Sequence, residues 1–154
     1  MRRKPKNDAE RGLLSQLECR VKFARDNDRL RNGWVYLNGA DFVLQHGVWY
    51  NPSPLPESVP RGIDRECFGN AWRLAYNNFA HYIEGYALAT GVPVITHHAW
   101  VDYPNGRKAI DNTWNEPGTA YLGVKFPLID VECGCSMLDN WEQGWPLFKK
   151  RWKK

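Results

Sequence analysis

The stretch ECFGNAWRLAYNNF, residues 66–79, decides how this 154-residue chain is organised. Its apolar residues recur every three or four positions, which predicts a helix over residues 67–80. Cys67 stands at the first position of that helix. A helix N-terminus favours the thiolate over the thiol, so Cys67 is a candidate nucleophile. A buried structural cysteine is the alternative that this helix leaves open.

The residues that follow this helix alternate between apolar and polar, which is typical of strands. We expect strands over residues 82–90, 94–103, 108–113 and 121–126. Pro104-Asn105-Gly106 predicts a tight hairpin turn that pairs residues 100–103 with 107–110. A helix followed by an antiparallel meander predicts an α+β fold.

The N-terminal part predicts a helix over residues 9–31, ended by Asn32-Gly33. A short strand over 34–37, a turn at Asn38-Gly39 and a strand over 42–50 are expected next. Three prolines at positions 52, 54 and 56 predict an extended loop that continues to Pro60, and we expect this loop to form one wall of a cleft. A short helical piece should start at residues 137–141. We therefore expect a single domain over residues 1–154, with its core at about 34–126 and basic tails at 1–6 and 149–154.

The composition excludes a disordered chain and a membrane-spanning one. Apolar residues make up 43% of the sequence and aromatic residues 14%, with eight tryptophans, which is too apolar for disorder. No run of 18 apolar residues is present, so no membrane partner is expected. The basic N-terminus is not followed by an apolar segment, so we expect no signal peptide and a cytoplasmic location.

The cysteines do not predict a metal site. They stand at positions 19, 67, 133 and 135. Only one residue separates Cys133 from Cys135, whereas zinc pairs normally have two to four between them. His97 and His98 are also a poor ligand pair, because adjacent strand residues point to opposite faces. No metal or cofactor is expected.

The net charge of +4 is gathered at the two tails. Solvated tails are one interpretation, and contact with nucleic acid is the other.

The strand over 94–103 places one of its two histidines on the helix side. His98, Trp100 and Asp102 share one face, and His97 shares the other with Ala99. The predicted hairpin brings Asp111 beside residues 98–100. A cysteine, a histidine and an aspartate then supply a thiol nucleophile, its base and the group that orients the base.

Four motifs in this order resemble the transglutaminase-like branch of the papain-like cysteine protease superfamily, and in particular its small bacterial and phage-type members. The motifs are CFGNA (67–71), YIEGYA (82–87), HAWV (98–101) and IDNTW (110–114), with YLGVKF (121–126) as a similar downstream strand. The resemblance implies a papain-like core, with the nucleophile helix packed on an antiparallel sheet. It selects His98 over His97 and Asp111 as the acid. Asn112 departs from the pattern, which usually has proline there.

The expected function is cysteine-dependent acyl transfer or hydrolysis at a peptide or carboxamide bond, by Cys67, His98 and Asp111. A protease, an amidase and a transglutaminase all fit this chemistry, and the small chain favours hydrolysis. Further candidates for contacting substrate or the oxyanion are Asn70, Gln45, Glu84 and Trp100. The alternative is an idle papain-like fold that binds a protein of the host cell in which a phage would express it. Protein or peptide substrates and host proteins are thus the expected partners.

Overall fold

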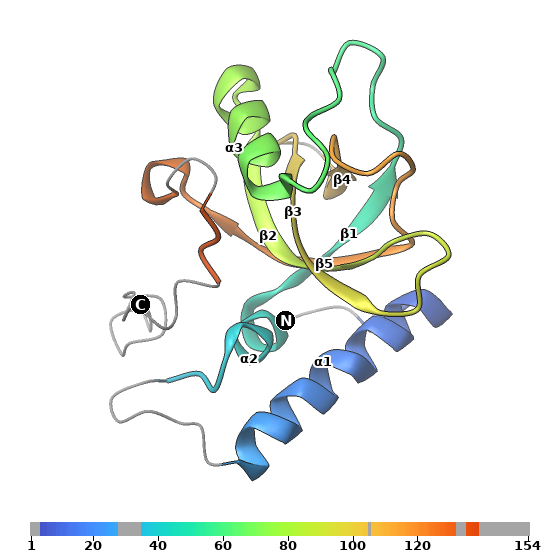
Figure 1. The fold of residues 1–154 in the computed structure, drawn as a ribbon, viewed down its shortest axis with the longest axis vertical. Coiled ribbons are helices and arrows are strands. Elements are labelled where there is room, and N and C mark those ends of the chain that lie inside the picture. Colours follow the sequence, from blue (N-terminus) through green and yellow to red (C-terminus); the bar gives the residue numbers. More distant parts are fainter. Residues whose placement is uncertain (1–3, 28–34, 105, 132–134, 139–154) are drawn as a thin grey trace.

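The computed structural model describes residues 4–27, 35–104, 106–131 and 135–138, and it is a mixed α+β fold (Figure 1). The α+β class predicted from the sequence is confirmed. In chain order the elements are α1 (Asp8–Asp26), α2 (Gly39–His46), β1 (Val48–Ser53), α3 (Cys67–Asn78), β2 (His81–Leu88), β3 (Ile95–Asp102), β4 (Lys108–Ile110), β5 (Ala120–Phe126) and the 3-10 helix η1 (Leu128–Asp130).

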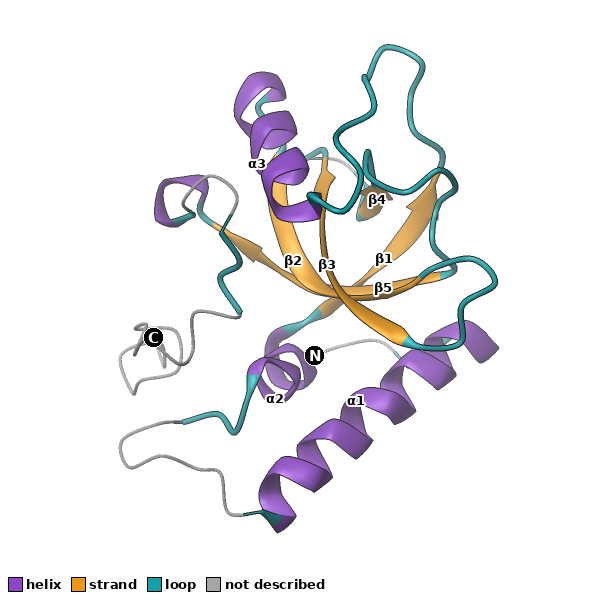
Figure 2. Ribbon diagram, viewed as in Figure 1, coloured by secondary structure: helices purple, strands orange, loops and turns teal. Residues whose placement is uncertain are grey.

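The five strands form a closed barrel in the order β1-β4-β3-β2-β5, with β5 pairing back onto β1 (Figure 2). Every pair is antiparallel except β1 with β4, which is parallel. β2 and β3 pair along their full length, from His81 opposite Asp102 to Leu88 opposite Ile95. By contrast β3 and β4 pair only where Val101 lies opposite Ile110, one residue from the expected register. The barrel is therefore least continuous between β3 and β4, the two strands of the predicted hairpin.

Apolar side chains gather in two clusters, one inside the barrel and one between the barrel and the helices. Strand alternation separates the clusters, because successive residues point to opposite faces. The inner cluster draws on all five strands and consists of Tyr50, Ile83, Ala87, Trp100, Ala109 and Tyr121. The outer cluster includes Leu13 and Leu17 of α1, Val43 of α2 and Leu74 of α3. β3 thus contributes Trp100 inward and its neighbours Ala99 and Val101 outward.

α3 packs against the outer faces of β2 and β3, while α1 and α2 cover the opposite end of the barrel (Figure 1). The buried stripe of α3 consists of Ala71, Leu74 and Ala75. The helix ends where Phe79 adopts a left-handed conformation with φ 51°. The predicted helix over residues 67–80 is confirmed to within two residues, and its first residue is Cys67.

The prediction for residues 34–50 is wrong over most of its length. Residues 35–37 form no strand, and residues 39–46 form α2 instead of a turn and a strand. Asn38 is not a turn residue, because its side chain accepts a hydrogen bond from the backbone N–H of Asp41 and caps the helix. Trp34 lies outside the described residues.

Other boundaries also differ from those expected, and β2 ends at Leu88 instead of residue 90. Residues 51–53 are the end of β1, so the proline-rich loop begins at residue 54. Proline has no backbone N–H, but position 52 does not need one on the side of β4. There the hydrogen bond to Arg107 O comes from the N–H of its neighbour Asn51. The returning strand stops at Ile110, and α1 stops at Asp26. Residues 28–34, residues 1–3 of the N-terminal tail, the whole C-terminal tail and residues 139–141 of the predicted C-terminal helix lie outside the described residues.

Substitution of Gly85 by alanine should destabilise the barrel strongly. A Cβ atom there would lie 2.1 Å from Leu122 O and 2.4 Å from Gly123 Cα on β5, so the backbones would have to separate. We expect a loss of about 3 kcal/mol in the free energy of unfolding, measured by urea denaturation. Gly12→Ala is the matched control: nothing lies within 4 Å of that position in α1, and it should stabilise by about 1 kcal/mol. Equal stabilities of the two variants would contradict this account.

Candidate active site

Cys67 begins α3, and Glu66 stands at the cap position before it. The Glu66 carboxylate makes no capping hydrogen bond to the helix backbone and instead accepts one from Arg73, at 3.3 Å. The first backbone bond of the helix runs from Asn70 N to Glu66 O, at 2.8 Å. The N–H groups of Cys67, Phe68 and Gly69 precede it and have no partner within the helix. Because helix N-termini favour negative charge, this end suits both a thiolate and an oxyanion.

The residue two positions before Cys67 has a strained backbone. Arg65 adopts a left-handed conformation, with φ 65°. Such strain at a residue other than glycine costs free energy and persists where the surrounding structure holds it. Here it turns the chain out of the loop over residues 54–66 and into α3.

His98 and Asp111 form a buried pair beside Cys67. His98 Nε2 lies 2.7 Å from Asp111 Oδ2, and the two residues are 1% and 4% exposed. With Nε2 engaged by Asp111, Nδ1 is the ring nitrogen left for Cys67, which lines the same pocket as His98. The structure therefore brings together the three residues that the sequence predicted as a nucleophile, a base and an orienting acid.

The electrostatics of this pair favour a charged histidine. Burial by itself lowers the pKa of His98, but the hydrogen bond and negative charge of Asp111, together with the neighbouring Cys67 side chain, outweigh burial and raise the pKa to about 9. For Asp111 burial by itself raises the pKa, because it disfavours the carboxylate. The hydrogen bond and charge of His98 and the backbone N–H groups of Thr113 and Trp114 outweigh burial, so the pKa of Asp111 is lowered overall. At neutral pH the site therefore holds an imidazolium between a carboxylate and the Cys67 sulfur.

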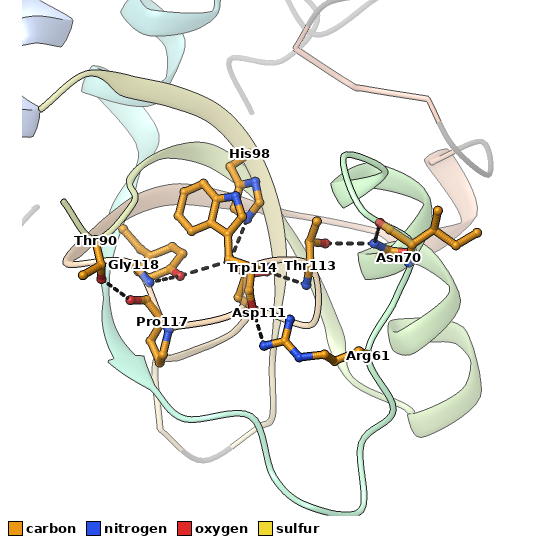
Figure 3. Close-up of polar contacts among 11 residues, drawn as sticks. Arg61, Asn70, Thr90, His98, Asp111, Thr113, Trp114, Pro117 and Gly118 are labelled. Carbon is orange, nitrogen blue, oxygen red and sulfur yellow. Dashed lines mark hydrogen bonds and ion pairs between the residues drawn. The ribbon is translucent and has the colours of Figure 1, made fainter. Parts of the chain in front are cut away.

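Trp114 covers the His98 ring. The two rings are nearly parallel, 13° apart, with centroids separated by 3.9 Å (Figure 3). Trp114 comes from the turn that follows Asp111, and its own backbone N–H donates to Asp111 Oδ1 at 3.3 Å. The indole thus keeps water from the His98–Asp111 hydrogen bond, which strengthens that bond.

The turn after Asp111 is held by the loop that leads into α3 (Figure 3). Arg61 donates to Trp114 O at 2.8 Å and to Asn115 O at 2.6 Å. Gly62 N donates to Asn112 O at 2.7 Å. The loop over residues 54–66 is therefore attached to the acid-bearing turn through residues 61–62 and leads directly into the nucleophile at its C-terminal end.

A pocket of about 490 Å³ opens onto the cysteine and the histidine. Its lining consists of Asp64, Arg65, Cys67, Phe68, Thr96, His97, His98, Thr113, Trp114 and Asn115. The lining comes from the loop before α3, from α3, from β3 and from the turn after Asp111. It includes both aromatic and charged side chains. A second pocket of similar volume lies between α1, α2 and β2, but its thiol, Cys19, has no histidine in the lining. The first pocket is therefore the candidate active site.

The other four sequence candidates lie outside this pocket. Gln45 is exposed on α2, at the opposite end of the barrel from α3, and donates to Asp41. Trp100 is buried in the inner cluster. Asn70 is buried in the first turn of α3, where its amide group donates to Ile63 O and Thr113 Oγ1. Both of its donor hydrogens are therefore used to join α3 to the loop and the turn.

Glu84, the fourth candidate, is fully buried on the outer face of β2. It accepts hydrogen bonds from His97 Nε2 at 2.7 Å and from Tyr82 Oη at 3.1 Å. It also accepts from the backbone N–H groups of Met137 and Leu138. Its ionisable partner is therefore His97, and it holds residues 137–138 against the barrel. His97 itself lines the pocket beside Phe68.

Sequence reasoning missed Tyr121, Arg61 and the position of Trp114 over His98. Tyr121 Oη donates to Asp111 Oδ2 at 3.1 Å. The alternation of apolar residues in β5 indicates that Tyr121 is buried. It does not indicate which carboxylate the Tyr121 hydroxyl contacts across the barrel. Trp114 follows Asp111 by three residues, and this spacing was the signal that could have placed its ring near the acid.

Within the described part of the chain, no three histidine, cysteine, aspartate or glutamate side chains come together so as to hold a metal ion. None of its helices is long and apolar enough to cross a membrane. Comparison with protein-family models, curated proteins and solved structures found no match to this chain.

The buried pair should make the stability of the protein fall at alkaline pH. A histidine whose pKa rises from 6.5 to about 9 on folding stabilises the protein fully below pH 6.5 and loses that contribution as pH rises towards 9. We expect the free energy of unfolding to fall by roughly 2 kcal/mol over this interval, measured by urea denaturation. His98→Gln should remove most of this dependence, whereas His81→Gln, outside the pocket, should retain it. An identical slope in the His98 variant would refute the assignment.

Proposed function

We propose that this protein catalyses acyl transfer or hydrolysis at a peptide or carboxamide bond through Cys67, His98 and Asp111. One observation supports the proposal most strongly. The buried His98–Asp111 pair lies beside a cysteine that starts a helix, and this cysteine and His98 both line one pocket. An inert structural cysteine does not need a charged histidine beside it.

In the first step the Cys67 thiolate attacks the carbonyl carbon of the substrate. The N–H groups at the start of α3 stabilise the negative charge that forms on the carbonyl oxygen. The carbon–nitrogen bond then breaks, and the leaving amine takes the proton from His98, which leaves a thioester on Cys67. Asp111 keeps the imidazole oriented throughout.

In the second step an acceptor releases the acyl group. His98, now neutral, removes a proton from water or from an amine, which attacks the thioester. Water yields a carboxylic acid, so that the protein acts as a protease or amidase. An amine yields a new amide, so that it acts as a transglutaminase. We favour water, because a chain of this size leaves little room for a second substrate channel.

The resemblance to the transglutaminase-like branch of papain-like enzymes supports the same proposal. Cys67 on a helix packed against β2 and β3, His98 on β3 and Asp111 after β4 follow the order that the resemblance implies. Asn112 stands where that branch usually has proline, and its backbone carbonyl accepts the hydrogen bond from Gly62 N. Proline has the same carbonyl, so this contact does not depend on the departure. A papain-like core is accordingly part of the proposal.

Cys67 should react with iodoacetamide at pH 6, where an ordinary thiol with a pKa of about 8.5 is almost wholly protonated. The test uses a protein in which Cys19, Cys133 and Cys135 are replaced by serine. His98→Gln should slow alkylation by roughly 30-fold or more, because the imidazolium that stabilises the thiolate is lost. His97→Gln is the matched control, since glutamine still donates to Glu84, and it should change the rate less than about threefold. Equal losses in the two variants would contradict the choice of His98.

The product should show whether water or an amine is the acceptor of the acyl group. Full-length protein is incubated with a mixture of unfolded proteins in ¹⁸O-labelled water, with a labelled primary amine present. Hydrolysis places ¹⁸O in a new carboxylate, which mass spectrometry detects, and we expect this product to exceed the amine adduct. Cys67→Ala should yield neither product. Formation of either product by Cys67→Ala would refute the proposal, and absence of both with a reactive Cys67 would favour the protein-binding alternative.

A further inference from the structure

The hydroxyl of Tyr121 lies between the acid of the proposed triad and a backbone N–H. Tyr121 belongs to β5 and is fully buried in the inner cluster. Its hydroxyl donates to Asp111 Oδ2 at 3.1 Å and accepts from Gly118 N at 2.7 Å. Asp111 Oδ2 is also the atom that His98 Nε2 contacts at 2.7 Å. Two donors thus share one carboxylate oxygen.

The position of this hydroxyl is fixed from several sides. The Tyr121 ring packs edge-on against Trp100, with centroids 5.0 Å apart, and lies 6.1 Å from the ring of Trp114. Gly118 approaches so closely that a Cβ atom there would lie 3.0 Å from the hydroxyl oxygen and 2.5 Å from Leu88 O. The chain therefore needs glycine at position 118 to bring this N–H to Tyr121.

Tyr121 is a neutral donor throughout the working range of pH. Burial raises its pKa, and the negative charge of Asp111 raises it further, so the phenol keeps its proton. The other ionisable groups around Asp111 are His98 from β3 and, through His98, Cys67 from α3. Arg61, from the loop before α3, faces the carbonyl oxygens of Trp114 and Asn115.

We propose that Tyr121 is a positioning residue of the proposed triad: its hydroxyl, held by Gly118, shares Asp111 Oδ2 with His98 and limits how tightly Asp111 holds the imidazolium. This inference rests on the proposed function. A carboxylate that also accepts a phenol hydrogen bond is a weaker acceptor for His98 than one that does not. With Tyr121 in place, His98 gives its proton to the leaving amine more readily.

The test compares Tyr121→Phe with Tyr82→Phe in the full-length chain. Tyr82 is also fully buried and also donates to a buried carboxylate, that of Glu84, at 3.1 Å. It is therefore matched in burial and bonding but not connected to Asp111. The first measurement is the NMR titration of the His98 ring, assigned with His98→Gln. The second is the pH dependence of Cys67 alkylation by iodoacetate, whose negative charge makes the rate depend on the imidazolium.

In the parent protein the His98 midpoint is expected at about pH 9. Tyr121→Phe should raise it by about half a unit or more, because Asp111 then holds the charged ring without competition. The alkaline fall in the iodoacetate rate should move by the same amount. Tyr82→Phe should leave both midpoints in place. Unchanged midpoints in folded Tyr121→Phe, or equal shifts in both variants, would overturn the proposal.

A second variant keeps the test decisive if Tyr121→Phe does not fold. Site-specific incorporation of 3-fluorotyrosine at position 121 retains the ring and the hydroxyl but makes the phenol a stronger donor, so the His98 midpoint should fall. A rise or no change would contradict the proposal. Failure of the proposed function has a different signature, because the parent Cys67 would then react with iodoacetamide at pH 6 no faster than an ordinary thiol. The NMR titration of His98 tests the role of Tyr121 whether or not Cys67 is activated.

Discussion

Four hydrogen-bond donors converge on the carboxylate of Asp111, and the arrangement of the site depends on them. Oδ1 accepts from the backbone N–H groups of Thr113 and Trp114, and Oδ2 accepts from His98 and Tyr121. A buried carboxylate is tolerated only when its oxygens are satisfied in this way. The backbone donors fix the turn that brings Trp114 over His98, and the side-chain donors join that turn to β3 and β5. Removing the charge would therefore disturb the local fold as well as the proposed chemistry.

Much of the candidate site was predictable because its parts are close in the sequence. The helix that starts at Cys67 follows from a regular apolar stripe, and the hairpin over residues 94–113 follows from strand alternation around a turn. Local patterns of this kind place His98 and Asp111 near each other even with a register error of one residue. The same patterns predicted the α+β class but not the closure of the barrel, which needs β1 to meet both β4 and β5.

What the sequence did not reveal depends on contacts between distant segments or on ambiguous short motifs. Asn38-Gly39 suits a hairpin turn and a helix cap equally well, and only packing of Val43 against the outer core decides for the helix. Gln45 was therefore expected on a strand and lies on α2, far from the pocket. Glu84 meets His97 through the pairing of β2 with β3, and Tyr121 meets Asp111 across the barrel. Neither partner can be identified from spacing along the chain.

The closed barrel also bears on how the chain folds. Residues 67–114, which contain the proposed triad, are joined by short connections, and β2 and β3 are neighbours in the sequence. Closure by contrast requires Val48 to pair with Gly123. Contacts between residues so far apart in the chain require a large loss of conformational entropy before they stabilise anything, and they slow folding. The pocket would thus be outlined early, whereas Tyr121 would reach Asp111 only as the last strand closes the barrel.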